Sequence, residues 1–189
     1  MAEPATALLA LWNDVDPALA AEYEAWHAVE HVPERLTVPG MQWAYRFGRA
    51  AAPRYLTLYG LRDAEVLEGE AYQRLLRDPT PTSRRLRPAL QNVSRWVCAL
   101  VEARGLGQGN HLAVWTTEQR DDDAPAYRLR AGGPDARGRL VAQRLAQASP
   151  LPWLHGGQAQ AIEGRWLMAL TLDGPGPADA AVYARLPVG

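Results

Sequence analysis

The sequence has 189 residues, of which 48% are hydrophobic and 22% charged, and its formal net charge is −1. This composition is typical of a globular protein with one substantial core or two small ones, and it argues against a chain that is disordered over most of its length. The charge balance disfavours nucleic-acid binding, and no apolar run approaches the roughly 20 residues of a membrane-spanning helix.

The residue types exclude several further classes of protein. Glu3 and Pro4 stand where a signal peptide would carry basic residues, so a cytoplasmic location is expected. All 20 basic residues are arginine, which excludes Schiff-base chemistry on lysine. Cys98 is the only cysteine, so we expect a buried, inert thiol and no thiolate-rich metal cage. No glycine-rich phosphate loop follows a strand, which disfavours nucleotide-dependent chemistry.

The first 104 residues alternate as β-α-β-β-α-β, which is the order of a ferredoxin-like unit. Pro17 opens a helix that is expected to end near Val32, because Pro33 has no N–H group to donate and restricts the residue before it. The expected strands are residues 6–12, 41–49, 55–59 and 94–102, and the expected helices are residues 17–32 and 63–77, with further helical turns after residue 81.

Aromatic side chains alternate along the two middle strands of this unit. We expect them to line the space between two sheets, with the leucine-bearing faces turned to the helices. Such a cavity suits a small, partly apolar molecule, although the same rings could simply fill a core. The residues concerned are Trp43, Tyr45, Phe47, Tyr55 and Tyr59.

Residues 105–109 form a plausible linker, and residues 110–189 are expected to be a shortened second copy. Leu112-Ala-Val-Trp115 echoes Leu9-Ala-Leu-Trp12, and Arg165–Leu172 is a predicted strand. We expect a helix from about 134 to 148, a strand from 152 to 162, a short helix around 179–186 and no fourth strand. The predicted fold class is α+β, with two ferredoxin-like halves whose antiparallel sheets pack face to face as a pseudo-dimeric α/β barrel.

The densest cluster of reactive side chains runs from Trp26 to Arg35. His27, Glu30 and His31 match the short H-x-x-E-H signature, in which two histidines hold zinc. A catalytic zinc site would need a third protein ligand, and such peptidases are much larger chains, so we reject a metal site here.

Several motifs follow one another in the first hundred residues: Trp26 to Leu36, Val38 to Gly40, Pro53 to Tyr59, Ala71-Tyr72 and Pro79 to Arg85. Through these motifs this part of the chain resembles the dimeric α/β-barrel superfamily, particularly its EthD-like members and their uncharacterised relatives. The resemblance implies the fold given above, and the chain departs from such relatives at His27, where they usually carry tyrosine. The superfamily includes cofactor-free monooxygenases, lactone isomerases, polyketide cyclases and haem enzymes, so the fold alone does not select a reaction.

His31 is the first candidate for a catalytic acid or base, with Glu30 or Glu34 tuning it, because imidazole titrates near neutrality. The alternative is a structural role for this cluster, as a helix cap or in ion pairs with Arg35. His155 is also the best single haem-ligand candidate, but no other feature supports haem. The expected substrate contacts are Trp12, Trp26, His27, Trp43, Tyr45, Tyr59, Trp115 and His155, with Arg46 as a further candidate.

Two functions stay open at this point. The first is an enzyme without metal or nucleotide cofactor (an isomerase, cyclase, lyase or monooxygenase) acting on an aromatic, polyketide-like or lactone substrate. The second is a non-catalytic protein of the same fold that binds a small ligand. A homodimer is also possible, because an incomplete second half would leave a sheet edge for another copy to pair with.

Overall fold

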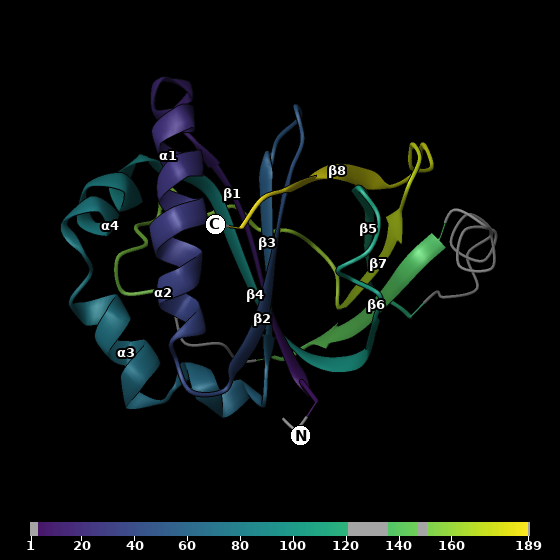
Figure 1. Ribbon diagram of the computed structural model, residues 1–189, viewed down its shortest axis with the longest axis horizontal. Helices are drawn as coiled ribbons and strands as arrows, with labels where there is room; N and C mark the ends of the chain where they lie inside the picture. The colour runs from purple at the N-terminus through teal and green to yellow at the C-terminus, as the bar shows by residue number, and fades with distance from the viewer. Residues whose placement is uncertain (1–3, 121–135, 147–150, 189) are drawn as a thin grey trace.

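The computed structural model describes residues 4–120, 136–146 and 151–188. Eight antiparallel strands close into a barrel in the order β1-β3-β2-β8-β5-β7-β6-β4 (Figure 1). The strands are β1 Ala7–Val15, β2 Met41–Gly48, β3 Tyr55–Leu61, β4 Leu90–Arg104, β5 His111–Thr117, β6 Ala136–Arg144, β7 Trp166–Leu172 and β8 Ala181–Leu186.

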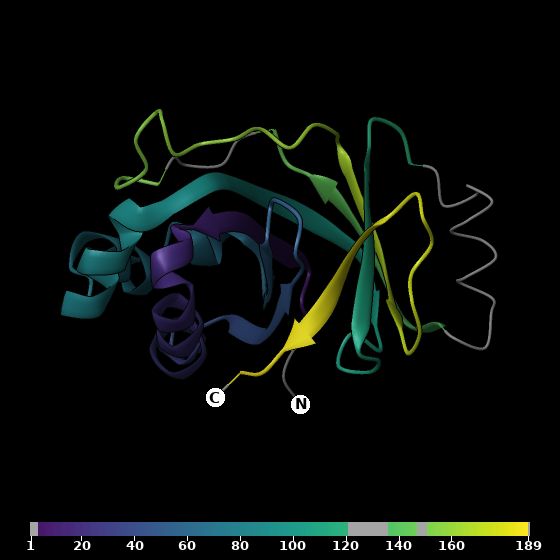
Figure 2. The same cartoon turned by 90° about the horizontal axis from the view of Figure 1, so that it is seen from above.

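The helices cover one side of the barrel, against β1 to β4, and β5 to β8 close the other side (Figures 1 and 2). The α-helices are α1 Ala20–Trp26, α2 Val32–Leu36, α3 Glu70–Arg77 and α4 Pro81–Leu86, and a π-helical turn at His27–His31 joins α1 to α2. None of these helices is long and apolar enough to cross a bilayer, within the part of the chain that the structure describes.

The predicted end of the first helix at Val32 is wrong. Pro33 lacks the N–H group that an α-helix would donate to the carbonyl of Val29, and the π turn accommodates this loss. The backbone N–H of Val32 donates to the carbonyl of His27 instead, and α2 then continues to Leu36.

The second half differs more from its prediction. The helix expected over 134–148 lies partly outside the described residues, and its described part is β6; the helix expected over 179–186 is β8. The segment expected as a strand over 152–162 is irregular, apart from one bridge between Ala159 and Val93. Each new strand pairs on both sides, β6 with β4 and β7, and β8 with β2 and β5. The backbone hydrogen bonds that β6 and β8 form on both sides outweigh the helical preference of their local sequence.

A fourth strand is therefore present in the second half. Around the barrel, the four strands of the first half follow the order β4-β1-β3-β2, which is the fourth, first, third and second along the chain. The four strands of the second half follow the same order, β8-β5-β7-β6. Because the barrel is closed, the described strands offer no free sheet edge of the kind on which the homodimer prediction rested.

Two large apolar cores fill the fold, beside a small third cluster formed by β5 and β7. One lies inside the barrel and contains the inward side chains of β2 and β3, Phe47, Leu56 and Leu58, together with the free thiol of Cys98. The other lies between the helices and the outer face of β1 to β4. Burial raises the pKa of Cys98 to about 12, as befits an unreactive core thiol.

The face assignment is correct for β2 and wrong for β3. Tyr45 lies opposite Leu58 and Phe47 opposite Leu56, and directly opposed residues of an antiparallel pair share a face. Leu56 and Leu58 therefore point into the barrel, whereas Tyr55 and Tyr59 point toward the helices.

Candidate functional site

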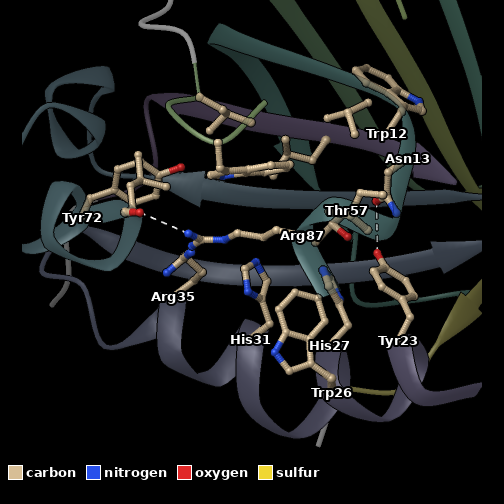
Figure 3. A pocket seen from close by; sticks show the side chains of 16 residues that line it. Trp12, Asn13, Tyr23, Trp26, His27, His31, Arg35, Thr57, Tyr72 and Arg87 are labelled. Atoms are coloured by element: carbon tan, nitrogen blue, oxygen red, sulfur yellow. Dashed lines mark hydrogen bonds between the residues drawn. The ribbon is translucent and has the colours of Figure 1, made fainter. Parts of the chain in front are cut away.

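A cavity lies between the helix layer and the outer face of the sheet, not between the two halves of the barrel (Figure 3). Its volume is about 60 Å³, and its mouth is open to solvent. The lining side chains are Leu11, Trp12, Asn13, Tyr23, Trp26, His27, His31, Arg35, Thr57, Tyr72, Leu76, Arg87, Leu90, Val93, Leu151 and Trp153.

The π turn sets the positions of the two histidines. His27 and His31 are four residues apart, and the turn keeps both rings on the cavity side of the helix (Figure 3). Their ring centroids lie 5.1 Å apart, with an angle of 29° between the ring planes. Single π-helical turns are common at functional sites.

Aromatic rings enclose these imidazoles. The ring of Trp26 lies 4.5 Å from that of His31, and the ring of Tyr23 lies 5.2 Å from that of His27. The hydroxyl of Tyr23 donates to Oδ1 of Asn13 at 3.1 Å, which fixes this end of the cavity. The result is a largely apolar wall that could hold a flat ring.

Both histidines are neutral near pH 7. Burial lowers the pKa of His27 and of His31 well below the ordinary value, and nearby arginines lower them further, chiefly Arg46 and Arg35 for His27 and Arg35 for His31. Nδ1 of each ring is buried and has no hydrogen-bond partner among the described residues. Each ring is therefore free to accept a proton from a bound molecule or to donate one to it.

Two buried arginines lie at the other end of the cavity (Figure 3). Nη1 of Arg35 lies 3.2 Å from a carboxylate oxygen of Glu34, and its guanidinium sits over the ring of Tyr72. Arg87 donates to the backbone carbonyls of Leu75 and Leu76. Burial lowers the pKa of Arg87 to about 10, and the charge of Arg35 adds to this shift, yet Arg87 remains cationic at neutral pH.

Glu30 does not occupy the predicted catalytic position. Its carboxylate accepts hydrogen bonds from Nε1 of Trp26 at 3.2 Å and from the hydroxyl of Thr80, and it is not part of the cavity lining. Thr80 also caps α4, so Glu30 ties the π turn to that helix. It acts on the site by holding Trp26 in place.

The other predicted contacts are divided between the two cores and the surface. Trp12, Trp26 and His27 line the cavity, whereas Trp43 and Tyr45 belong to the barrel interior. Tyr59 is buried under the helices, outside the cavity lining. Arg46 also points to the helix side, where it donates to the carbonyl of Glu24.

Trp115 and His155 lie away from the cavity. Trp115 lies on the outer face of the second half, where Nε1 is 3.3 Å from a carboxylate oxygen of Asp179. His155 is exposed in a surface groove beside the cavity mouth, next to Trp153.

Sequence reasoning missed Arg35 and Arg87 as cavity residues. Arg35 was detectable, since it lies four residues after His31 and so on the same helix side. Arg87 and Trp153 carried no such signal, because they reach the cavity from segments far away in the chain.

Comparisons with known proteins identify the fold. No family model and no curated protein matches the sequence. Among solved structures, an anthrone oxidase-like protein superposes with a TM-score of 0.58 at 12% identity, over 97% of this chain and 92% of that one. A protein described as a candidate monooxygenase from Fusobacterium nucleatum superposes with a TM-score of 0.56 at 8% identity, over 98% and 94%.

A candidate chlorite dismutase also matches, with a TM-score of 0.56 at 8% identity over 98% of this chain and 96% of that one. The chain therefore shares the α+β barrel fold of these structures. At these identities the likeness establishes the fold alone, and the EthD-like resemblance stays a prediction.

Proposed function

We propose that this chain is a small-molecule oxygenase that removes a proton from an aromatic substrate and lets the resulting anion react with O₂. The observation that carries the proposal is the neutral imidazole of His31 in an aromatic-walled cavity, flanked by buried cations. A neutral ring can accept a proton, and nearby guanidinium groups stabilise the negative charge that the substrate then carries.

The names of the structural relatives support a reaction of this type and suggest an anthrone as the first substrate to try. For an anthrone the balance is R₂CH₂ + O₂ → R₂C=O + H₂O. His31 takes the C–H proton, the carbanion forms a C–O bond with O₂, and the peroxide oxygen receives a proton. Loss of water from the hydroperoxide then leaves the ketone, so carbon is oxidised and O₂ is reduced.

The other cavity residues have distinct roles in this proposal. Trp26 and Trp153 hold the substrate ring, and Arg35 and Arg87 stabilise the anion. Enclosure matters because a carbanion exposed to water would be protonated again before O₂ reacts.

We also propose that the fold is a tandem pseudo-dimer, with halves at 1–104 and 110–189 and a linker at 105–109. The repeated strand order of the two halves supports this division. The second half would then take the place that a second subunit has in a simpler relative, and residues 151–160 of that half lie beside the catalytic cavity of the first.

The test is oxygen consumption with anthrone, followed by absorbance of the quinone product. The wild type should exceed the uncatalysed rate, and His31→Gln should lower the rate by about 10² or more, the usual contribution of a general base. His155→Gln is the matched control, because His155 is exposed outside the cavity and its loss should leave the rate unchanged. Equal rates for His31→Gln and wild type would refute the role of His31.

The second hypothesis, a ligand-binding protein without catalysis, predicts a different result from the same measurement. The aromatic cavity would bind the ring, but no substrate would consume O₂ above the background rate. Tight binding without turnover across a panel of hydroxylated aromatics would favour this function.

A further inference from the structure

The two buried arginines of the cavity have only one carboxylate partner between them among the described residues, and it contacts Arg35. Arg35 and Arg87 are 4% and 5% exposed. The guanidinium of Arg35 has five N–H donors and one side-chain acceptor, Glu34. Within the described parts of the chain, the hydrogen bonds of Arg87 go to the backbone carbonyls of Leu75 and Leu76, at 3.0 and 3.1 Å. A buried cation without a counter-ion is costly, so this end of the cavity is one charge short of balance.

Among the residues that the structure describes, no carboxylate lines this cavity. The carboxylate of Glu30 is turned to Trp26 and Thr80, and His27 and His31 are neutral. The guanidinium groups of Arg35 and Arg87 lie close to one another at the end of the cavity near Tyr72, and each lowers the pKa of His31 (Figure 3). The free donors of both groups are thus available for one planar anion.

The walls next to these arginines are apolar and aromatic. Trp153 lies under the guanidinium of Arg87, with 5.7 Å between Cζ and the ring centroid, and Tyr72 lies under that of Arg35 at 5.6 Å. Leu76, Leu90 and Leu151 complete this part of the cavity. A ligand with a flat ring and one anionic end would match both features.

A surface groove leads to the cavity. Arg87, Leu76 and Trp153 are shared between the cavity and this groove, and Arg77 and Arg84 also line the groove. Arg77 is paired with Glu70 and Arg84 with Asp78, so Arg87 is the groove arginine without a carboxylate partner among the described residues.

We propose that Arg35 and Arg87 together bind the carboxylate of an aromatic acid, whose ring lies against Trp153 and Trp26. The proposal deepens the function proposed above and rests on it for the reaction, because it makes the substrate an aromatic carboxylic acid. Binding of the acid follows from the cavity itself and does not require turnover.

Binding of such an acid would also change His31. Arg35 and Arg87 disfavour protonation of this ring, and a carboxylate between them would offset their charge. Its pKa should rise when the acid is bound, which would make His31 a stronger base only in the complex.

The test compares 2-naphthoate with 2-naphthamide, which keeps the ring and lacks the charge, by isothermal titration calorimetry on the full chain. The wild type should bind the acid at least about tenfold more tightly, since a charge-assisted, bidentate contact contributes about 1.4 kcal/mol or more. Arg35→Met and Arg87→Met should each weaken naphthoate about tenfold and change naphthamide less than twofold. Arg104→Met removes an equal charge far from the cavity and should change neither.

Equal affinity of wild type for acid and amide would overturn the proposal, and so would equal losses for both ligands in the Arg35 variant. Arg87 also holds the end of α3, so if the Arg87 variant does not fold, the wild-type comparison of acid and amide decides. Proton NMR of His31 gives a second readout: its pKa should rise with naphthoate and not with naphthamide. Tight naphthoate binding together with no O₂ consumption in the anthrone assay would refute the proposed oxygenase and leave this site standing.

Discussion

His27 and His31 should make the stability of the protein depend on pH. Their native pKa values lie well below the ordinary value because of burial, so the unfolded state binds more protons below about pH 6.5. The free energy of unfolding should therefore fall as pH decreases from 6.5 to 5, by at most about 1.4 kcal/mol per pH unit for each histidine. Urea unfolding at several pH values measures this slope.

His27→Phe tests the assignment, because phenylalanine keeps a ring in the stack with Tyr23 and His31 and cannot be protonated. The variant should lose part of the slope below pH 6.5 and behave like wild type above pH 7. An unchanged slope would show that His27 titrates normally in the folded protein. Exposed His155 gives the control: His155→Phe should leave the slope as it is.

Gly60 is a residue whose missing side chain matters for the barrel core. The indole of Trp43 lies over Gly60 on the opposite strand, in the space that a β-carbon would occupy. Gly60→Ala should therefore destabilise the protein by about 2 kcal/mol through overpacking. Gly156→Ala is the control, since a β-carbon there meets nothing within 4 Å. Thermal unfolding of the two variants measures the difference; equal stability would contradict this packing.

At the scale of elements, residues 151–160 act as a covering segment that joins the second half to the cavity of the first. Gln158 anchors it: Nε2 donates to the carbonyls of Arg87, Pro88 and Leu90. Its backbone carbonyl also accepts from the N–H of Val93 at 2.7 Å. Leu151 and Trp153 thereby stay over the cavity mouth.

Gln158→Ala should loosen this segment and lower stability by about 1 to 2 kcal/mol, because two half-buried carbonyls and the exposed carbonyl of Pro88 lose a donor. Hydrogen exchange at the Val93 amide should become faster, and urea unfolding measures the loss. Gln160→Ala is the control, since Gln160 is exposed and its N–H still donates to the Val93 carbonyl. Equal exchange rates at Val93 in the two variants would show that Gln158 does not anchor the segment.

At the scale of the whole molecule, the closed barrel couples the two halves. β2 pairs with β8 and β4 with β6, so neither half can lose its strands without opening the ladders of the other. We expect one cooperative unfolding transition, with fluorescence and circular dichroism giving coincident curves. The thiol of Cys98 in the barrel interior should react with a thiol reagent only across that same transition. A separate early transition would contradict a shared barrel.

The sequence by itself determined the first half and the general class of the fold. Alternating strands at 41–49 and 55–59, a helix opened by Pro17 and the cluster from Trp26 to Arg35 are local signals, and residues 1–104 contain all of them. The importance of His31 as a cavity residue was also predictable, because it lies on the same helix side as His27.

Only the tertiary structure decided which face of β3 meets the helices, and that residues 136–144 and 181–186 are strands. These outcomes depend on cross-strand register and on closing ladders with distant partners, which local periodicity does not contain. The same holds for the cavity: Arg35, Arg87 and Trp153 come together from three parts of the chain. The unbalanced positive charge of the two arginines arises because these segments pack together, so no single segment of the sequence shows it.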